Sequence, residues 1–153
     1  METFWDREEE QQRLRRQVGK GGFGYITGRR RIGKTALLKK VCEASGGLYH
    51  QAVEGTSQQQ LTHFVEECGR ILPILQQVVP KSWSEFFALL TQEKLPPLMV
   101  FDEFPYWVQG DPSLPSFLQK WVDHELTAKK TLLLLSGSSQ AMLFSQFLNQ
   151  SAP

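Results

Sequence analysis

Gly28 and Gly33 enclose four residues and are followed directly by Lys34 and Thr35, which is the spacing of a phosphate-binding loop. A polyphosphate is held by several backbone N–H groups, and glycine lets the chain curl closely enough to supply them. Lys34 would bring a positive charge to the β and γ phosphates, and the Thr35 hydroxyl is a ligand for Mg²⁺. We therefore predict a nucleotide-binding segment made of Gly28, Arg29, Arg30, Arg31, Ile32, Gly33, Lys34, Thr35 and Ala36.

The sequence around this segment has the order that such a loop requires. Residues 23–27 are mostly apolar and favour a strand, and residues 33–45 have the spacing of an amphipathic helix. The start of that helix would direct unpaired N–H groups and the positive end of its dipole at the phosphates. A chance match in a basic, glycine-containing turn is the alternative, and the flanking elements disfavour it. For the arginines at 29–31 three environments stay open: the phosphates, a neighbouring subunit or solvent.

An acidic pair, Asp102 and Glu103, follows the continuous apolar run at residues 98–101. Such a run is typical of a strand that is buried on both faces of a parallel sheet. Ligand-binding groups in parallel sheets lie at the carboxyl ends of the strands, where both acids stand. We predict that Asp102 binds Mg²⁺ directly or through a ligand, complementing Thr35, and that Glu103 orients the attacking water. The alternative is a solvated start of a loop.

A second apolar run at residues 131–135 ends in Ser136, Ser138 and Ser139. The corresponding strand is expected between the strand before the loop and the strand before the acids. A hydroxyl there could contact the γ-phosphate or the attacking water, and we predict that Ser138 does so, with Ser139 as the second choice and a serine-rich turn as an equal alternative. The predicted catalytic residues are Lys34, Glu103 and Ser138, and the predicted metal ligands are Thr35 and Asp102.

Strand patterns at residues 23–27, 48–53, 98–101 and 131–136 alternate with helix patterns at about residues 6–18, 33–45, 56–72, from 82 onward and 114–127. This alternation predicts an α/β fold, with a mostly parallel sheet covered by helices on both faces in a three-layer P-loop NTPase core. Four strands are evident, so the first would lie at an edge of the sheet. We expect an N-terminal polar helix and lead-in at residues 1–22 and the nucleotide-binding core at 23–153.

The composition is that of an ordinary globular domain: 153 residues, 41% hydrophobic, 22% charged and a net charge of +1. Residues 1–40 carry eleven Lys and Arg against five Asp and Glu, a bias that nucleotide binding largely explains. The two cysteines are expected to be buried free thiols, and the three histidines to be ordinary surface or strand residues, because none has metal-site spacing. Apolar runs are too short for a membrane span, so a cytoplasmic protein without a membrane partner is expected.

Five stretches resemble motifs of the archaeal-type ATPase family, an AAA+-like branch of the P-loop ATPases related to the signal-transducing STAND NTPases. They lie at residues 4–10, which is similar to an opening Phe-x-x-Arg-x-x-Glu box, and at 28–35, 101–106, 118–123 and 135–139. The resemblance implies ATP as the nucleotide, the strand order 5-1-4-3-2, and Ser138 as a sensor at the end of the fourth strand. It also implies the roles given above for Lys34, Thr35, Asp102 and Glu103.

The family pattern continues past the sensor strand with a fifth strand and a helical lid, whereas this sequence stops at Pro153. We therefore expect a core without these elements, which is either a truncated part of a longer protein or a unit that works with a homo-oligomer or partner protein supplying the lid or an arginine finger. The first functional hypothesis is Mg²⁺-dependent hydrolysis of ATP by in-line attack of water. Others are a STAND-like nucleotide switch with little turnover and a nucleic-acid-linked module based on the basic first quarter. A small-molecule kinase is disfavoured, because it would need an acceptor pocket and lid arginines.

Overall fold

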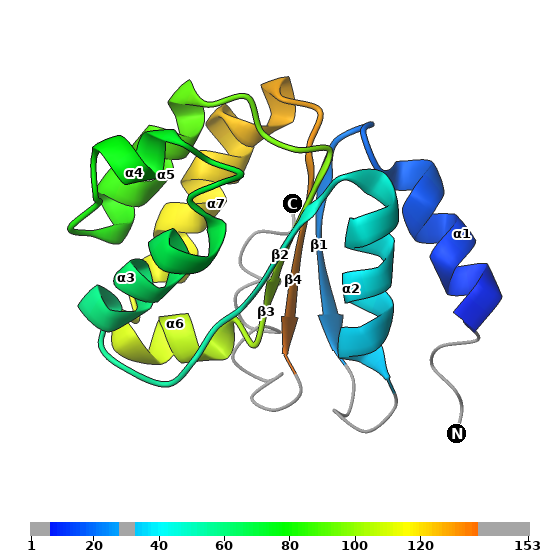
Figure 1. The fold of residues 1–153 in the computed structure, drawn as a ribbon, viewed down its shortest axis with the longest axis horizontal. Coiled ribbons are helices and arrows are strands. Elements are labelled where there is room, and N and C mark those ends of the chain that lie inside the picture. The colour runs from blue at the N-terminus through cyan, green and yellow to red at the C-terminus, as the bar shows by residue number, and fades with distance from the viewer. Residues whose placement is uncertain (1–6, 28–32, 138–153) are drawn as a thin grey trace.

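The computed structural model describes residues 7–27 and 33–137 of the chain (Figure 1). In chain order the elements are α1 (Arg7–Gln17), β1 (Gly22–Thr27), α2 (Lys34–Ser45), β2 (Leu48–Gln51), α3 (Ser57–Cys68), α4 (Ile74–Gln77), α5 (Trp83–Gln92), β3 (Leu98–Asp102), α6 (Pro105–Gly110), α7 (Leu114–His124), the 3-10 helix η2 (Leu126–Ala128) and β4 (Leu132–Gly137).

The four described strands form one parallel sheet in the order β1-β4-β3-β2. Leu135 on β4 is paired with Tyr25 on β1 and with Phe101 on β3, so β4 lies between the strand before the loop and the strand that ends in the acids. Every residue of β3 and β4 is buried, which matches their continuous apolar sequences. The predicted α/β fold with a parallel sheet is confirmed, and β1 lies at an edge among the described strands.

Helices cover both faces of the sheet (Figure 1). On one face, α2 packs Leu38 and Val41 against Val100 and Leu134, and α1 adds the half-buried Leu14 to this layer. On the other face, α3 to α7 enclose an aromatic core in which the rings of Phe64, Phe86 and Trp107 contact one another edge to face. The sheet is therefore held between two apolar layers, and its polar functional groups are confined to the ends of the strands.

Most predicted boundaries hold, and a few differ from the structure. Thr56 caps α3 in a reciprocal capping box with Gln59, and Ser82 caps α5. However, α3 ends at Cys68, not at residue 72, and β2 ends at Gln51, not at residue 53. The segment predicted as one helix at 114–127 is divided into α7 and η2. The six-residue helix α6 was not predicted, since it is too short to show a helical period.

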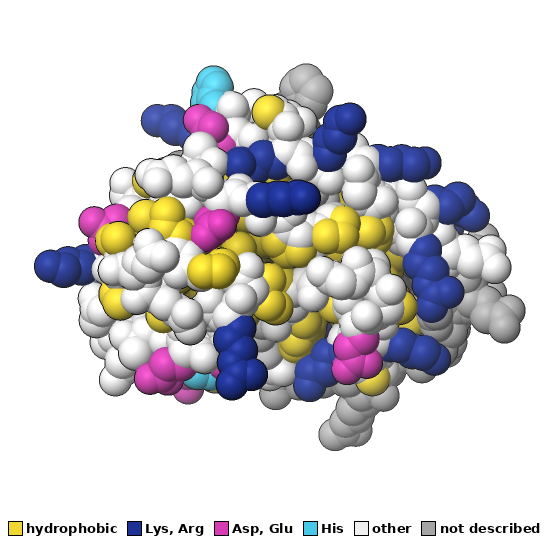
Figure 2. Space-filling model, turned by 45° about the horizontal axis from the view of Figure 1, so that its top comes forward, with side chains coloured by type: hydrophobic (Ala, Val, Ile, Leu, Met, Phe, Trp, Pro, Cys, Tyr) yellow, Lys and Arg dark blue, Asp and Glu magenta, His cyan; other side chains and the backbone are white. Residues whose placement is uncertain are grey.

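Basic side chains are most frequent on the side of the molecule formed by α1 and α2, at the right of Figure 2. Arg13, Arg15 and Arg16 of α1 are exposed, whereas Leu14 and Val18 turn toward the sheet. Three of the eleven basic residues at positions 1–40 thus lie on a solvated helix face. Among the described helices, none is both long and apolar enough to cross a membrane.

Candidate functional site

Four of the predicted site residues, Lys34, Thr35, Asp102 and Glu103, are brought together at the edge where the parallel strands end, at the bottom of Figure 1. There, α2 begins beside the ends of β3 and β4. Gly33 precedes α2 with φ 80° and ψ 16°, a left-handed conformation that glycine adopts without a steric penalty. This turn sets Lys34 and Thr35 at the start of the helix, where N–H groups and the helix dipole favour an anion.

Asp102, at the end of β3, is the centre of the site. Its side chain is fully buried, as is that of Lys34, and the Lys34 ammonium donates to Oδ1 at 3.0 Å in an ion pair. The same oxygen accepts a hydrogen bond of 2.5 Å from the Ser136 hydroxyl on β4 and one of 2.9 Å from the Glu103 backbone N–H. Residues 68 apart in the sequence thereby form one charge-assisted cluster.

The second carboxylate oxygen of Asp102 contacts Thr35, the other predicted metal ligand. Oδ2 accepts a hydrogen bond of 2.9 Å from the Thr35 hydroxyl and one of 2.5 Å from the Tyr49 hydroxyl on β2. Burial raises the pKa of Asp102, but the hydrogen bonds from Ser136 and Tyr49 and the charge of Lys34 outweigh it and hold this pKa below its usual value. The carboxylate is therefore ionised and saturated with donors.

Glu103 has an unusual backbone conformation next to this cluster. Its φ is 55°, which ordinary residues adopt at a cost of about 1–2 kcal/mol, and the residue is 5% exposed. Two contacts fix the turn: the Phe104 N–H donates to the Ser136 carbonyl at 2.9 Å, and the Tyr106 N–H donates to the Glu103 carbonyl at 3.0 Å. Strain held in place by surrounding contacts is frequent at functional positions.

Because the backbone of Glu103 is strained, we expect an unusual order of stability between two variants at this position. Both Glu103→Gly and Glu103→Ala remove the side chain, but only glycine accepts a positive φ without strain. We expect the glycine variant to be more stable than the alanine variant by about 1 kcal/mol, measured by urea unfolding. At an ordinary backbone position alanine would be favoured, because glycine has more conformational entropy in the unfolded chain. A more stable alanine variant would contradict the strained conformation.

Tight packing closes the end of β4. A Cβ atom on Gly137 would lie 2.7 Å from the Tyr25 hydroxyl and 2.9 Å from Cδ of Pro105, so a larger residue does not fit without movement. Burial raises the pKa of Tyr25, and the negative charges of Glu103 and Asp102 raise it further. The Tyr25 side chain thus belongs to the surroundings of the acidic pair.

The structure adds residues that the sequence did not identify and leaves others undescribed. Tyr49 was missed, because its contact with Asp102 depends on the pairing of β2 with β3, which local sequence does not indicate. The Ser136 hydroxyl, noted at the end of the apolar run, donates to Asp102, whereas Ser138, preferred as the functional hydroxyl, lies outside the described residues and stays a prediction. Ala36 lies in the first turn of α2 and is exposed. The predicted residues outside the described ranges are Gly28, Arg29, Arg30, Arg31, Ile32 and Ser138.

The histidines are arranged in a way that the sequence did not predict. His124 is exposed at the end of α7, as expected of a surface residue. His50, however, is a buried strand residue, and its ring lies beside His63 and the carboxylate of Glu67. Burial lowers the pKa of His50 to about 4, although Glu67 acts in the opposite direction. The positions of these residues in the sequence did not indicate a cluster, which forms because α3 packs on β2.

Comparisons with known proteins identify the family and the fold. A family model described as an ATPase domain found predominantly in Archaea matches residues 4–153. An uncharacterized protein of Methanocaldococcus jannaschii is 34% identical over 152 residues, which are 98% of this chain and 33% of that protein. Among solved structures, a Walker-type ATPase of Pyrococcus abyssi matches with a TM-score of 0.64 and 17% identity, over 97% of this chain and 49% of that one. The chain therefore spans about a third of the curated relative's length.

Proposed function

Since the chain belongs to the family of ATPase domains found predominantly in Archaea, we propose that it binds ATP with Mg²⁺ where β1, β3 and β4 end, and hydrolyses it. The observation that carries this proposal is the buried cluster in which Asp102 joins Lys34 and Thr35, the two side chains that a phosphate-binding loop directs at phosphate and metal. The three residues come from two distant segments and occupy the expected positions relative to the sheet.

Lys34 would neutralise the β and γ phosphates. In the structure its ammonium is fully buried against Asp102, so it must exchange at least part of that contact for the phosphate oxygens. A phosphate can accept this charge because the start of α2 offers N–H groups at the same place. Residues 28–32, with Gly33 and Ala36, would complete the ring of donors around the phosphates. The Lys34–Asp102 ion pair would thereby hold the lysine near its working position.

The side chains present fit a magnesium ion, which prefers a few protein oxygens together with phosphate oxygens and water. Thr35 would bind the ion through its partly exposed hydroxyl. Asp102 would act mainly through Thr35, because its own oxygens already accept five hydrogen bonds. When bound, the ion would neutralise charge that develops on the phosphates.

Glu103 would accept a proton from, and orient, the water that attacks the γ-phosphate. Its support is positional: it follows Asp102 directly, it is largely buried, and a left-handed turn held by backbone hydrogen bonds fixes it there. Ser138, one residue beyond the described end of β4, would be the sensor of the γ-phosphate. In the same proposal, a second copy of the chain or a partner protein supplies an arginine to the site.

The test of nucleotide binding is a comparison of the wild-type chain with Lys34→Ala. We expect the variant to bind Mg²⁺-ATP about a hundredfold more weakly, because two or more charge-assisted hydrogen bonds to phosphate are lost. Isothermal titration measures both affinities. A nucleotide switch with little turnover would show the same binding of ATP. It would differ in two other measurements: ATP would change the assembly state seen by size-exclusion chromatography, and phosphate release would not be sustained.

A further inference from the structure

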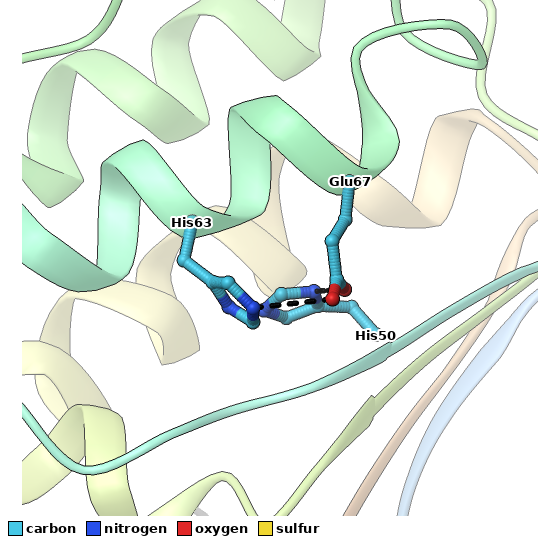
Figure 3. A group of neighbouring side chains, drawn as sticks. All are labelled: His50, His63 and Glu67. Atoms are coloured by element: carbon cyan, nitrogen blue, oxygen red, sulfur yellow. Dashed lines mark hydrogen bonds and ion pairs between the residues drawn. The ribbon is translucent and has the colours of Figure 1, made fainter.

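Two histidines and a glutamate converge between β2 and α3 (Figure 3). The Nδ1 atom of His50 lies 2.9 Å from one carboxylate oxygen of Glu67, and the Nε2 atom of His63 lies 3.1 Å from the other. One potential ligand atom from each residue lies within 4.8 Å of the other two. Tetrahedral zinc ligands at about 2.0 Å from the ion are roughly 3.3 Å apart, so small rotations would bring these three to the required spacing.

The cluster has the layout of a binding site open on one side. His50 is 1% exposed and is fixed by ring contacts with Phe64 and Trp107, whereas His63 and Glu67 are 29% and 49% exposed. His63 and Glu67 stand one turn apart on α3, so they present their side chains on the same face. One ligand is thus rigid and buried, and two can adjust at the surface, where an ion can enter.

We propose that His50, His63 and Glu67 form a binding site for a divalent transition-metal ion, with Zn²⁺ as the occupant and solvent as the fourth ligand. Imidazole nitrogen and carboxylate oxygen are ligands that zinc takes in proteins, and two histidines with one glutamate leave a fourth position open. Mg²⁺ and Ca²⁺ are poor candidates, because they prefer sets of oxygen ligands. The single negative charge of Glu67 would partly balance the ion.

The surroundings set limits on this site. Cys68 Sγ lies 4.0 Å from His50 Nδ1, but the thiol is buried beneath the cluster, and we assign it no bond to the metal. The outer nitrogens, Nε2 of His50 and Nδ1 of His63, are buried without a hydrogen-bond partner among the described residues. Metal-binding histidines are usually held by such partners, which contribute about 10–100-fold in affinity. The site should therefore bind zinc more weakly than a typical structural zinc site.

This site is separate from the proposed nucleotide site and does not rest on it. Successive residues of a strand point to opposite faces of the sheet, so Tyr49 faces α2 and Asp102 while His50 faces α3. A bound ion would connect β2 to α3 on the far side from Lys34. Zinc affinity should consequently be the same whether or not nucleotide binding is intact.

Zinc binding by the nucleotide-free chain, measured by competition with a chromogenic chelator, tests the proposal. We expect one zinc per chain, and at least about tenfold weaker binding in His63→Gln and in Glu67→Gln. Matched controls are His124→Gln, an exposed histidine outside the cluster, and Glu66→Gln, the exposed neighbour of Glu67. Both controls should bind zinc as the wild type does. Equal affinity in all five proteins, or no saturable binding by the folded wild type, would overturn the site.

Two further readouts identify the ligands and guard against a folding artefact. Co²⁺ in place of zinc should give the visible absorption of a tetrahedral ion without an intense thiolate band, and such a band would overturn the ligand set because it requires a cysteine. Zinc at about a hundred times its Kd should raise the melting temperature of the wild type by about 5 °C or more, but not that of His63→Gln. If His50, His63 and Glu67 are only hydrogen-bonded to one another and bind no metal, zinc should not change the melting temperature of either protein.

Discussion

Replacing Glu103 by Gln is expected to leave Mg²⁺-ATP binding nearly unchanged and to lower the rate of phosphate release by about 10²–10⁴-fold. The amide keeps the size of the side chain and the same backbone conformation, but it cannot take a proton from the attacking water. Steady-state phosphate release and nucleotide titration on the same preparation separate the two effects.

The outcome distinguishes the roles that the acidic pair could play. Undiminished turnover in Glu103→Gln would show that another group orients the water. The matched control is Glu85→Gln, which changes the charge of an exposed acid on α5 outside the Asp102 cluster and should leave turnover unchanged. A wild-type chain that binds ATP without releasing phosphate would instead favour the switch.

Removing the Asp102 side chain should have the largest effect on stability. In Asp102→Ala the Lys34 ammonium would be left buried without its counter-ion, and the hydroxyls of Ser136 and Tyr49 would lose an acceptor. Breaking one side of a buried ion pair typically costs about 3–5 kcal/mol, and we expect a loss of this size in the free energy of unfolding. Urea titration monitored by tryptophan fluorescence measures it.

The double variant Lys34→Ala/Asp102→Ala provides the internal test of that mechanism. Because it removes both charges, it should be more stable than Asp102→Ala alone. Asp123→Ala, which removes an exposed acid on α7, should change the stability by less than about 0.5 kcal/mol. If the double variant loses at least as much free energy of unfolding as the two single variants lose together, the buried charge is not the source of the loss.

Much of the site could be predicted because its chemistry is encoded in short stretches. Gly33-Lys34-Thr35 opens a helix after a strand, and Asp102 ends a continuous apolar strand, so the rule that parallel strands end at one edge was enough to place them together. The alternation of these apolar runs with helix patterns predicted the parallel sheet and its two helical layers. These inferences used patterns that are local in sequence.

What could not be predicted depends on pairing between distant segments or on strained geometry. The Tyr49 hydroxyl reaches Asp102 because Gln51 is paired with Asp102 in the sheet, and no local pattern sets that register. The approach of His50 to Glu67 likewise requires α3 to pack on β2. The positive φ of Glu103 was unexpected, because Asn or Gly is the usual residue in that conformation.

The most direct test of the central claim is isothermal titration of Mg²⁺-ATP into the chain of residues 1–153, with Lys34→Ala and Lys40→Ala alongside. Lys40 is an exposed lysine on the same helix, so its variant controls for a general loss of positive charge. We expect one ATP per chain for the wild type and Lys40→Ala, and binding about a hundredfold weaker for Lys34→Ala. Equal affinity in all three proteins, or no binding by the folded wild-type chain, would contradict a nucleotide site centred on Lys34, Thr35 and Asp102.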